Sequence, residues 1–131
     1  MQSARSREIV PPVGLPAPRF RYSPVVRVGA FVYVSGLVGL DESTGELAPG
    51  GAYGETAQIL RNLGNLCDSQ GWTLAQLIVA RIYCGPRAEA KQINRAWGEA
   101  FADIVPPARS FVGVQSLPLD AAVEIEFQLA V

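Results

Sequence analysis

The chain has 131 residues, a length at which one domain of ordinary size folds without disulfide bonds or bound metal. Its formal net charge of −1 provides no basic surface for nucleic acid or for an anionic membrane. Histidine is absent, which excludes Ser-His and Cys-His catalysis and removes the commonest metal ligand.

The composition also points to self-association. Apolar residues make up 49% of the chain and charged residues only 18%, below the usual ~25%. A small domain of this composition has more apolar surface than it can bury by itself. We therefore expect an oligomer.

Two cysteines, Cys67 and Cys84, are the only candidates for thiol chemistry. Both lie within apolar patterns and neither belongs to a Cys-x-x-Cys motif, so we expect buried thiols in a reducing compartment and no metal site. No stretch approaches the ~18 apolar residues of a membrane span, and the N-terminus lacks the apolar run of a signal peptide. These features predict a soluble, cytoplasmic protein.

Residues 1–21 are rich in proline and arginine. Prolines at this density exclude a helix and favour extended, weakly ordered chain. We treat this stretch as an N-terminal arm that either packs on the domain or stays apart from it, and residues 22–131 as a single domain. The arginines are Arg5, Arg7, Arg19 and Arg21, and the prolines are Pro11, Pro12, Pro16 and Pro18.

The domain is predicted to open with a β-hairpin. Two β-rich runs, residues 25–28 and 31–34, flank Gly29 and Ala30, a two-residue turn in which glycine supplies the unusual backbone angles. Ser35-Gly36 is expected to end the second strand. A polar loop rich in turn residues follows, over residues 41–45.

The middle of the chain predicts two helices and a strand. Apolar residues at helical spacing run from Tyr53 to a C-terminal cap at Gly71, and again over residues 93–101. Between them, residues 77–84 are short, apolar and rich in β-branched side chains, which is typical of a strand buried on both faces.

Two further strands are predicted after Pro106-Pro107, over residues 109–116 and 122–129. In the last strand apolar and polar side chains alternate strictly. The element order is then ββαβαββ, an α+β fold with a mixed sheet. Because two helices cover only one face of such a sheet, we expect its other apolar face to pack against another subunit.

The segment that carries the most chemical information spans these two strands. Arg109 stands beside Ser110, and Glu124 and Glu126 follow on the next strand. An arginine can hold a small carboxylate while a glutamate positions a water molecule. The alternative is an ordinary Arg-Glu pair between two strands.

The stretch PPARSFVGVQSLPLDAAVEIEFQLAV resembles the C-terminal signature of the Rid family, the reactive intermediate deaminases. Residues 34–36 and the segment DESTGEL at residues 41–47 are similar to the family's first hairpin and following loop. Residues 93–101 resemble its second helix. The resemblance runs from about residue 22 to residue 131.

This resemblance implies a chorismate-mutase-like fold and a homotrimer whose sheets pack inward, with sites in clefts between subunits. Family members hydrolyse enamines and imines, such as 2-aminoacrylate or 2-iminobutanoate, to 2-keto acids and ammonia. No cofactor is implied, and the expected partner is a small imino or keto acid.

The resemblance also assigns roles to residues. Arg109 matches the arginine that grips the substrate carboxylate, and Glu124 matches the glutamate that orients the attacking water. Four further positions match residues of the substrate cleft. The alternative for Ser35 and Gly36 is that they simply end a strand, and the alternative for Asn94 is that it is a solvated helix residue. These four are Tyr22, Ser35, Gly36 and Asn94.

Three departures from the family pattern, at four positions, predict an altered substrate pocket. Phe111 stands where the family often has cysteine, and on the strand face of Arg109 it either shrinks the pocket or favours an aromatic or apolar substrate group. Phe20-Arg21 replaces a Gly-Pro pair before Tyr22, and Leu37 replaces a glutamine.

Two other functions compete with imine hydrolysis. One is a binding module that holds a 2-keto acid in the same cleft without turnover, which needs Arg109 but not Glu124. The other is the ribonuclease or translation-inhibitor activity attributed to some relatives. The net charge, the single lysine Lys91 and the absence of histidine disfavour it.

Overall fold

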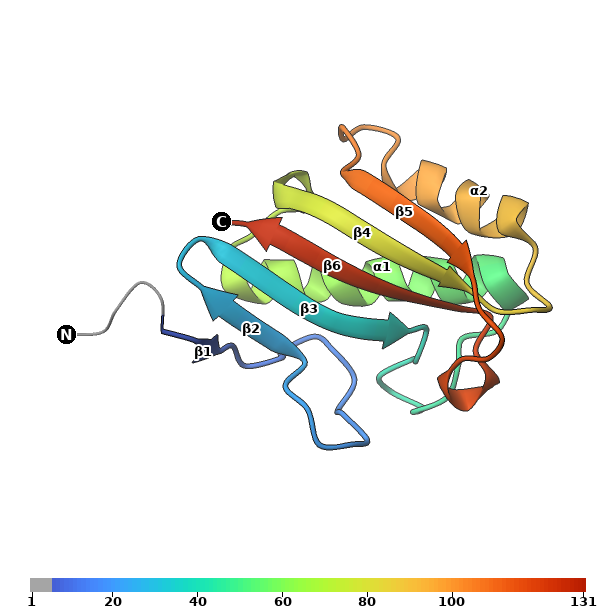
Figure 1. Cartoon of the computed structure of the whole chain (residues 1–131), viewed down its shortest axis with the longest axis horizontal. Coiled ribbons are helices and arrows are strands. Elements are labelled where there is room, and N and C mark those ends of the chain that lie inside the picture. The colour runs from blue at the N-terminus through green and yellow to red at the C-terminus, as the bar shows by residue number, and fades with distance from the viewer. Residues whose placement is uncertain (1–5) are drawn as a thin grey trace.

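Six strands form one mixed sheet in the order β1-β2-β3-β6-β4-β5 (Figure 1). The computed structural model describes residues 6–131. β4 and β5 pair in parallel and the other neighbours are antiparallel, which confirms the predicted mixed sheet. The strands are β1 (Glu8–Ile9), β2 (Val25–Val28), β3 (Phe31–Val38), β4 (Leu77–Cys84), β5 (Ala108–Gly113) and β6 (Val123–Ala130).

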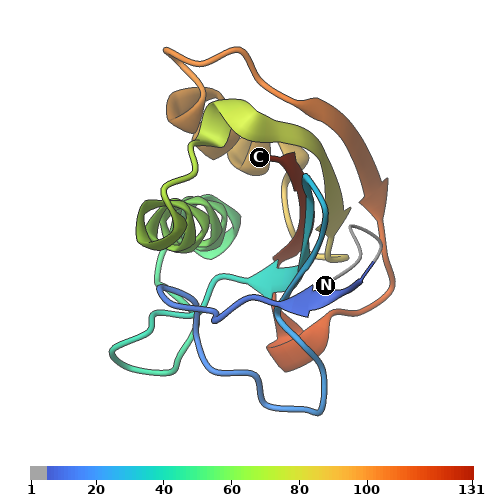
Figure 2. The ribbon, with the colours of Figure 1, turned by 90° about the vertical axis from the view of Figure 1, so that its left-hand side faces the viewer.

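Both predicted helices are present and lie on the same face of the sheet (Figure 2). They are α1 (Gly51–Gln70) and α2 (Ala90–Ala100). Two short 3-10 helices, η1 (Leu74–Gln76) and η2 (Pro118–Asp120), precede β4 and β6.

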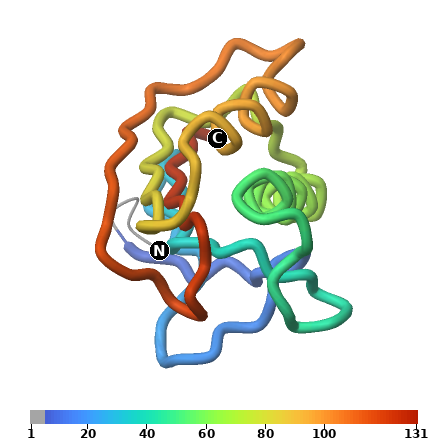
Figure 3. The backbone as a smooth tube through the Cα atoms, turned by 90° about the vertical axis from the view of Figure 1, so that its right-hand side faces the viewer, coloured from blue at the N-terminus to red at the C-terminus, as the bar shows by residue number. Residues whose placement is uncertain are grey.

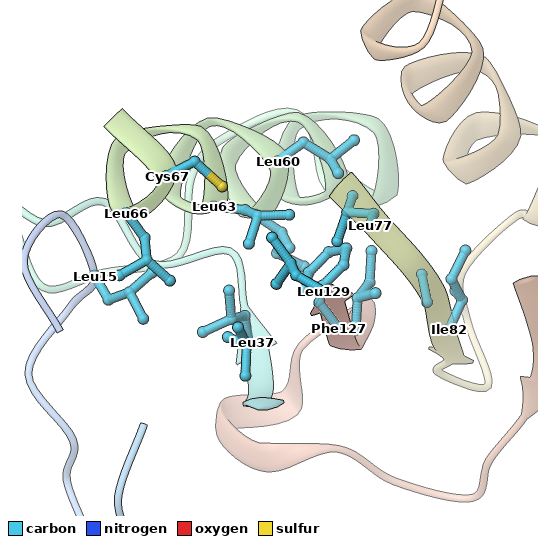
Figure 4. Packing of buried hydrophobic residues seen from close by; sticks show 14 of the residues in the cluster. Leu15, Leu37, Leu60, Leu63, Leu66, Cys67, Leu77, Ile82, Phe127 and Leu129 are labelled. Atoms are coloured by element: carbon cyan, nitrogen blue, oxygen red, sulfur yellow. The ribbon is translucent and has the colours of Figure 1, made fainter. Parts of the chain in front are cut away.

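The apolar stripe of α1 packs against the sheet and forms the centre of the core (Figure 4). Ile59, Leu63 and Leu66 are completely buried. The helix ends as predicted at Gly71, whose φ of 76° is a left-handed conformation that glycine adopts without strain. The N–H of this glycine donates to the carbonyl oxygen of Cys67, so one of the last carbonyls of the helix has a hydrogen-bond partner.

The predicted alternation of the last strand is confirmed in β6. Val123, Ile125, Phe127 and Leu129 are buried beneath the helices, whereas the side chains between them are half-buried. Glu124 therefore lies on the sheet face that the helices leave uncovered. We call this side of the sheet the open face.

The end predicted for the second strand of the hairpin is wrong. β3 continues through Ser35 and Gly36 to Val38, with a register shift between Val34 and Leu37 where it pairs with β6. The small residues mark an irregularity in a long strand, because pairing with the distant β6 extends the strand past them.

β4 has the predicted bounds, but the prediction that both its faces are buried is wrong. Within one chain Ile78 is 37% exposed and Arg81 is also exposed, because the helices cover only one face. The neighbouring β5 ends at Gly113 instead of residue 116, since β4 itself stops at Cys84 before Gly85-Pro86 and offers no further partner.

Part of the N-terminal arm packs onto the domain. β1 pairs with β2, and Val10 and Leu15 are buried in the same core as α1. Arg5 lies outside the described residues. The division of the chain at residue 22 remains a prediction.

The open face carries large apolar side chains. Phe31 and Tyr33 on β3 are 48% and 47% exposed, and Val112 on β5 is 47% exposed. These side chains have the composition expected of a surface that another protein covers.

Removing the central side chain of α1 should test this account of the core. Leu63→Ala leaves a cavity between α1 and the sheet, and we expect it to lower the free energy of unfolding by about 2–5 kcal/mol. Urea denaturation at fixed protein concentration measures the change. The control Val105→Ala alters a side chain that is 88% exposed and should stay within about 0.5 kcal/mol of the parent. Equal effects of the two variants would contradict the proposed packing.

Candidate functional site

A cavity of about 550 Å³ lies at one end of the sheet. Its walls come from the loop before β2, from β3, from η2 and from β6. Figures 1 and 3 show that loop and η2 at the same end of the sheet. The lining residues are Pro16, Ala17, Arg19, Phe20, Tyr22, Ser35, Gly36, Leu37, Val38, Leu40, Pro118, Leu119 and Glu124.

Glu124 provides the only carboxylate among these lining residues, and its side chain lies directly against the backbone of Gly36. A Cβ atom placed on Gly36 would stand 2.8 Å from Oε2 of Glu124, closer than real Cβ atoms come to other atoms. Glycine is therefore required for this glutamate to take its position. The predicted association of Gly36 with Glu124 is thus a direct contact in the structure.

The surroundings of Glu124 raise the pKa of its carboxyl group. The larger cause is burial, which penalises the charged form, and the second is the negative charge of Glu126 on the same face. Glu126 itself accepts a hydrogen bond from the hydroxyl of Tyr83 on β4. A carboxylate with a raised pKa is a stronger base than an ordinary glutamate.

A second hollow of about 480 Å³ lies on the other side of Glu124. It shares Gly36, Pro118 and Glu124 with the first cavity and is also lined by Tyr83 and Glu126. The carboxylate of Glu124 thus stands in the wall between two spaces. A water molecule and an organic ligand can approach it from different sides.

Ser35 and Tyr22 are brought to the same cavity. The hydroxyl of Ser35 donates to the carbonyl oxygen of Ser23 at 2.8 Å, and its N–H donates to that of Pro24 at 2.9 Å. These bonds join β3 to the segment that carries Tyr22, whose side chain is 48% exposed. Ser35 therefore holds the cavity wall in place.

Arg109 lies on the opposite face of the sheet from Glu124. In β5 it is aligned with Ala80 of β4, which is buried beneath the helices, whereas Glu124 is aligned with Tyr83 on the open face. One chain thus places the two predicted catalytic residues on different faces. Within residues 6–131 Arg109 forms no salt bridge, so the alternative of an Arg-Glu pair between strands is wrong.

Aromatic rings surround the guanidinium of Arg109. Its central carbon lies 5.5 Å from the ring centre of Trp97 on α2 and 5.6 Å from that of Phe111. Such contacts favour the cation and leave the N–H groups in the guanidinium plane available to a ligand. Phe111 shares the strand face of Arg109, as predicted.

Asn94 belongs to the same side of the molecule as Arg109. It is exposed on α2 one turn before Trp97, the residue over which the arginine lies. The structure thus divides the predicted site residues into two groups. Arg109, Phe111 and Asn94 form one group, and Tyr22, Ser35, Gly36 and Glu124 form the other.

Several lining residues were absent from the sequence-based site. Phe20 and Leu37 are predicted only to alter the substrate pocket, and Leu119 lies between the last two predicted strands. A signal for Phe20 and Leu119 was present in the sequence: both are large apolar residues in segments otherwise made of proline, arginine and turn residues.

Within residues 6–131, no three His, Cys, Asp or Glu side chains gather closely enough to hold a metal ion. In the part of the chain that the structure describes, no helix is both long and apolar enough to cross a membrane.

Known proteins are similar in sequence to this chain over most of its length. The family model described as Endoribonuclease L-PSP matches residues 14–131. A RutC family protein of Aquifex aeolicus is 36% identical over 121 residues, which cover 92% of this chain and 95% of that protein. The 2-iminobutanoate/2-iminopropanoate deaminase of Mus musculus is 32% identical over 120 residues, 92% of this chain and 88% of the mouse protein.

Solved structures share the fold. A conserved Rid family protein of Yersinia pestis superposes with a TM-score of 0.87 at 27% identity, over 96% of this chain and 100% of that one. RidA of an Antarctic Psychrobacter superposes with a TM-score of 0.82 at 28% identity, over 99% of this chain and 97% of that one. The predicted chorismate-mutase-like α+β fold is confirmed. The chain belongs to the Rid family, whose family model is described as Endoribonuclease L-PSP.

Proposed function

We propose that this protein hydrolyses small reactive 2-imino acids, of the 2-aminoacrylate and 2-iminobutanoate type, to 2-keto acids and ammonia. The observation that carries the proposal is the partly buried Glu124, with a raised pKa, in the wall of a cavity. The names of mammalian relatives, which are imino-acid deaminases, support the same reaction.

The reaction needs one base and a bound water molecule. The imino acid reacts with its C=N group protonated: Glu124 accepts a proton from the water as the water oxygen forms a bond to C2, and the electron pair of the C=N bond moves to nitrogen. Glu124 then passes this proton to the nitrogen, ammonia leaves as the C–N bond breaks, and Glu124 takes the hydroxyl proton as the C=O bond forms. An imine is already electrophilic, so positioning and one base supply sufficient acceleration.

Arg109 binds the substrate carboxylate in this proposal, through two parallel hydrogen bonds from its planar fork. Because Arg109 and Glu124 lie on opposite faces of the sheet, a single chain cannot bring both to one small substrate. The arginine must therefore come from a neighbouring subunit. A homotrimer with the open faces packed inward would supply it and would cover Phe31, Tyr33 and Val112.

We also propose that the protein works in the cytoplasm. Both cysteines are free and buried, and burial raises the pKa of the Cys67 thiol to about 11 and raises that of Cys84. Thiols of this kind are unreactive and suit a reducing compartment.

The proposed assembly predicts a molecular mass near three times the chain mass of 14.0 kDa. Burial of the apolar open face is the physical reason. Light scattering at micromolar protein concentration measures the mass. A monomer would contradict both the packing of the open face and the shared site.

Replacement of Arg109 tests carboxylate binding. We expect Arg109→Lys to lower kcat/KM for imine hydrolysis about 10- to 100-fold, because the point charge of lysine cannot form two parallel bonds. Folding should change little, since the side chain is exposed. The matched control is Arg61→Lys, an exposed residue of α1 that lines neither cavity at Glu124, which should retain parental kcat/KM. Parental activity in Arg109→Lys would refute this role.

Replacement of Glu124 separates an enzyme from a binding module. Glu124→Gln keeps the shape of the side chain but cannot accept a proton, so hydrolysis should slow by about 10²- to 10⁴-fold. Calorimetry with a 2-keto acid should show a much smaller change in affinity. If the variant hydrolyses imines as fast as the parent, Glu124 is not the base.

The raised pKa of Glu124 also predicts the pH profile. The base must be unprotonated, so kcat/KM should fall as the pH drops through that pKa, at a pH above the ordinary glutamate value of 4.5. Glu126→Gln removes a neighbouring negative charge and should move this acid limb to lower pH. An acid limb that stays in place would show that the two carboxyl groups do not interact.

A further inference from the structure

The cavity beside Glu124 extends well beyond what a three- or four-carbon acid fills. Its volume is about 550 Å³, in the range of pockets for considerably larger ligands. Most of its lining side chains are apolar, and they stand on the side of Glu124 away from Glu126 and Tyr83. The space is therefore suited to an apolar group attached to the reacting carbon.

Two segments outside the sheet's long strands supply the largest apolar side chains of this cavity. Phe20 and Tyr22 come from the loop before β2 and are 79% and 48% exposed, and Leu119 comes from η2 and is 45% exposed. Leu37 of β3 also borders the cavity, but it pairs with Ile125 and its side chain belongs to the core beneath the helices. Three exposed apolar side chains thus converge on one space instead of being scattered over the surface.

The backbone of η2 holds Leu119 in an unusual conformation. Its φ and ψ are 60° and 20°, and the next residue, Asp120, has a φ of 54°. Left-handed backbone is unfavourable for leucine, so the neighbouring structure must impose it. Asp120 forms an ion pair with Arg87, and the N–H of Ala121 donates to the carbonyl oxygen of Pro118.

The loop that carries Phe20 is tied to its surroundings as well. Nη2 of Arg19 donates to the carbonyl oxygen of Gly45 at 2.6 Å, and the N–H of Tyr22 donates to that of Phe20 at 3.1 Å. The guanidinium of Arg19 is therefore used, at least in part, to attach this loop to the loop after β3. Phe20 is left to face the cavity.

We propose that Phe20 and Leu119 form a side-chain subsite that selects 2-imino acids with large apolar side chains, such as those derived from phenylalanine or leucine, over those derived from alanine. The inference rests on the proposed function and specifies its substrate: imines of the 2-aminoacrylate and 2-iminobutanoate type would be hydrolysed, but less efficiently than those with large apolar side chains. It also assigns substrate selection to side chains at the Glu124 cavity, in addition to Phe111, which packs beside Arg109 and would come to the site with it from a neighbouring subunit.

Competition between imino acids tests this selection directly. An amino-acid oxidase generates the imines of phenylalanine, leucine, alanine and 2-aminobutyrate, and their loss is followed with the parent protein. We expect kcat/KM to favour the phenylalanine-derived imine over the alanine-derived one by about tenfold or more. A parent protein that prefers the alanine-derived imine would overturn the inference.

Two variants locate the selectivity. Leu119→Gly removes the side chain and also suits the left-handed backbone, and Phe20→Ala removes an exposed ring, so both proteins should fold. Each should reduce the phenylalanine-to-alanine selectivity ratio at least fivefold. Val105→Ala, an exposed apolar residue outside the cavity, is the matched control and should keep the parental ratio. Parental ratios in both variants would also overturn the inference.

Binding of 2-keto acids separates the subsite from the proposed reaction. Calorimetry should show phenylpyruvate bound about tenfold more tightly than pyruvate, with the difference reduced in Leu119→Gly. If this holds but no imine is hydrolysed, the proposed function fails and the subsite stands. If 2-oxoglutarate binds most tightly and Arg19→Gln abolishes that preference, the cavity selects a second carboxylate and the apolar subsite is wrong.

Discussion

The contact between the Glu124 side chain and the backbone of Gly36 determines what this site can do. β3 passes beneath the carboxylate at its register shift, and only a residue without a side chain allows the approach. Burial of the carboxyl group raises its pKa, and the charge of Glu126 adds to the effect. A glutamate in this state accepts a proton more readily than one in water. Attack by water on an imine needs little more, because the protonated C=N carbon is already strongly electrophilic.

The separation of Arg109 from Glu124 has an electrostatic consequence. β4 lies between β5 and β6, and the alternation of side chains along these strands sends the cation and the carboxylate to opposite faces. If the two groups met within one chain, the arginine would lower the pKa of the glutamate and its fork would be occupied. In one chain the arginine fork therefore stays free until a neighbouring subunit and a substrate carboxylate complete the proposed site. The charge of the substrate carboxylate can then be neutralised by Arg109 while Glu124 remains a base.

Local sequence patterns predicted the elements that depend on local physics. The helical spacing of α1, its end at Gly71 and the alternation of β6 were readable because each reflects one element packing on one side. The errors concern long-range pairing. The extension of β3 past Gly36 depends on pairing with β6, some ninety residues away. Arg109 and Glu124 lie on opposite faces because β4 inserts between β5 and β6, which are consecutive in sequence. The resemblance identified residues around Glu124 and pointed to an altered pocket at Phe20, but no pattern located Leu119 at the cavity.

The fold separates the residues proposed to take part in the reaction from the side chains proposed to select the substrate. Glu124 and Gly36 lie on paired strands inside the sheet, where a change at either position would disturb the other. Phe20 and Leu119 lie on a loop and a turn that are fixed by their own hydrogen bonds and by the Arg87–Asp120 ion pair. Side chains on such segments can change without altering strand pairing. A leucine held in left-handed backbone is costly unless its side chain contributes something that glycine would not. The apolar surface that it adds beside the base is such a contribution, because it removes water from the space where the substrate side chain would lie.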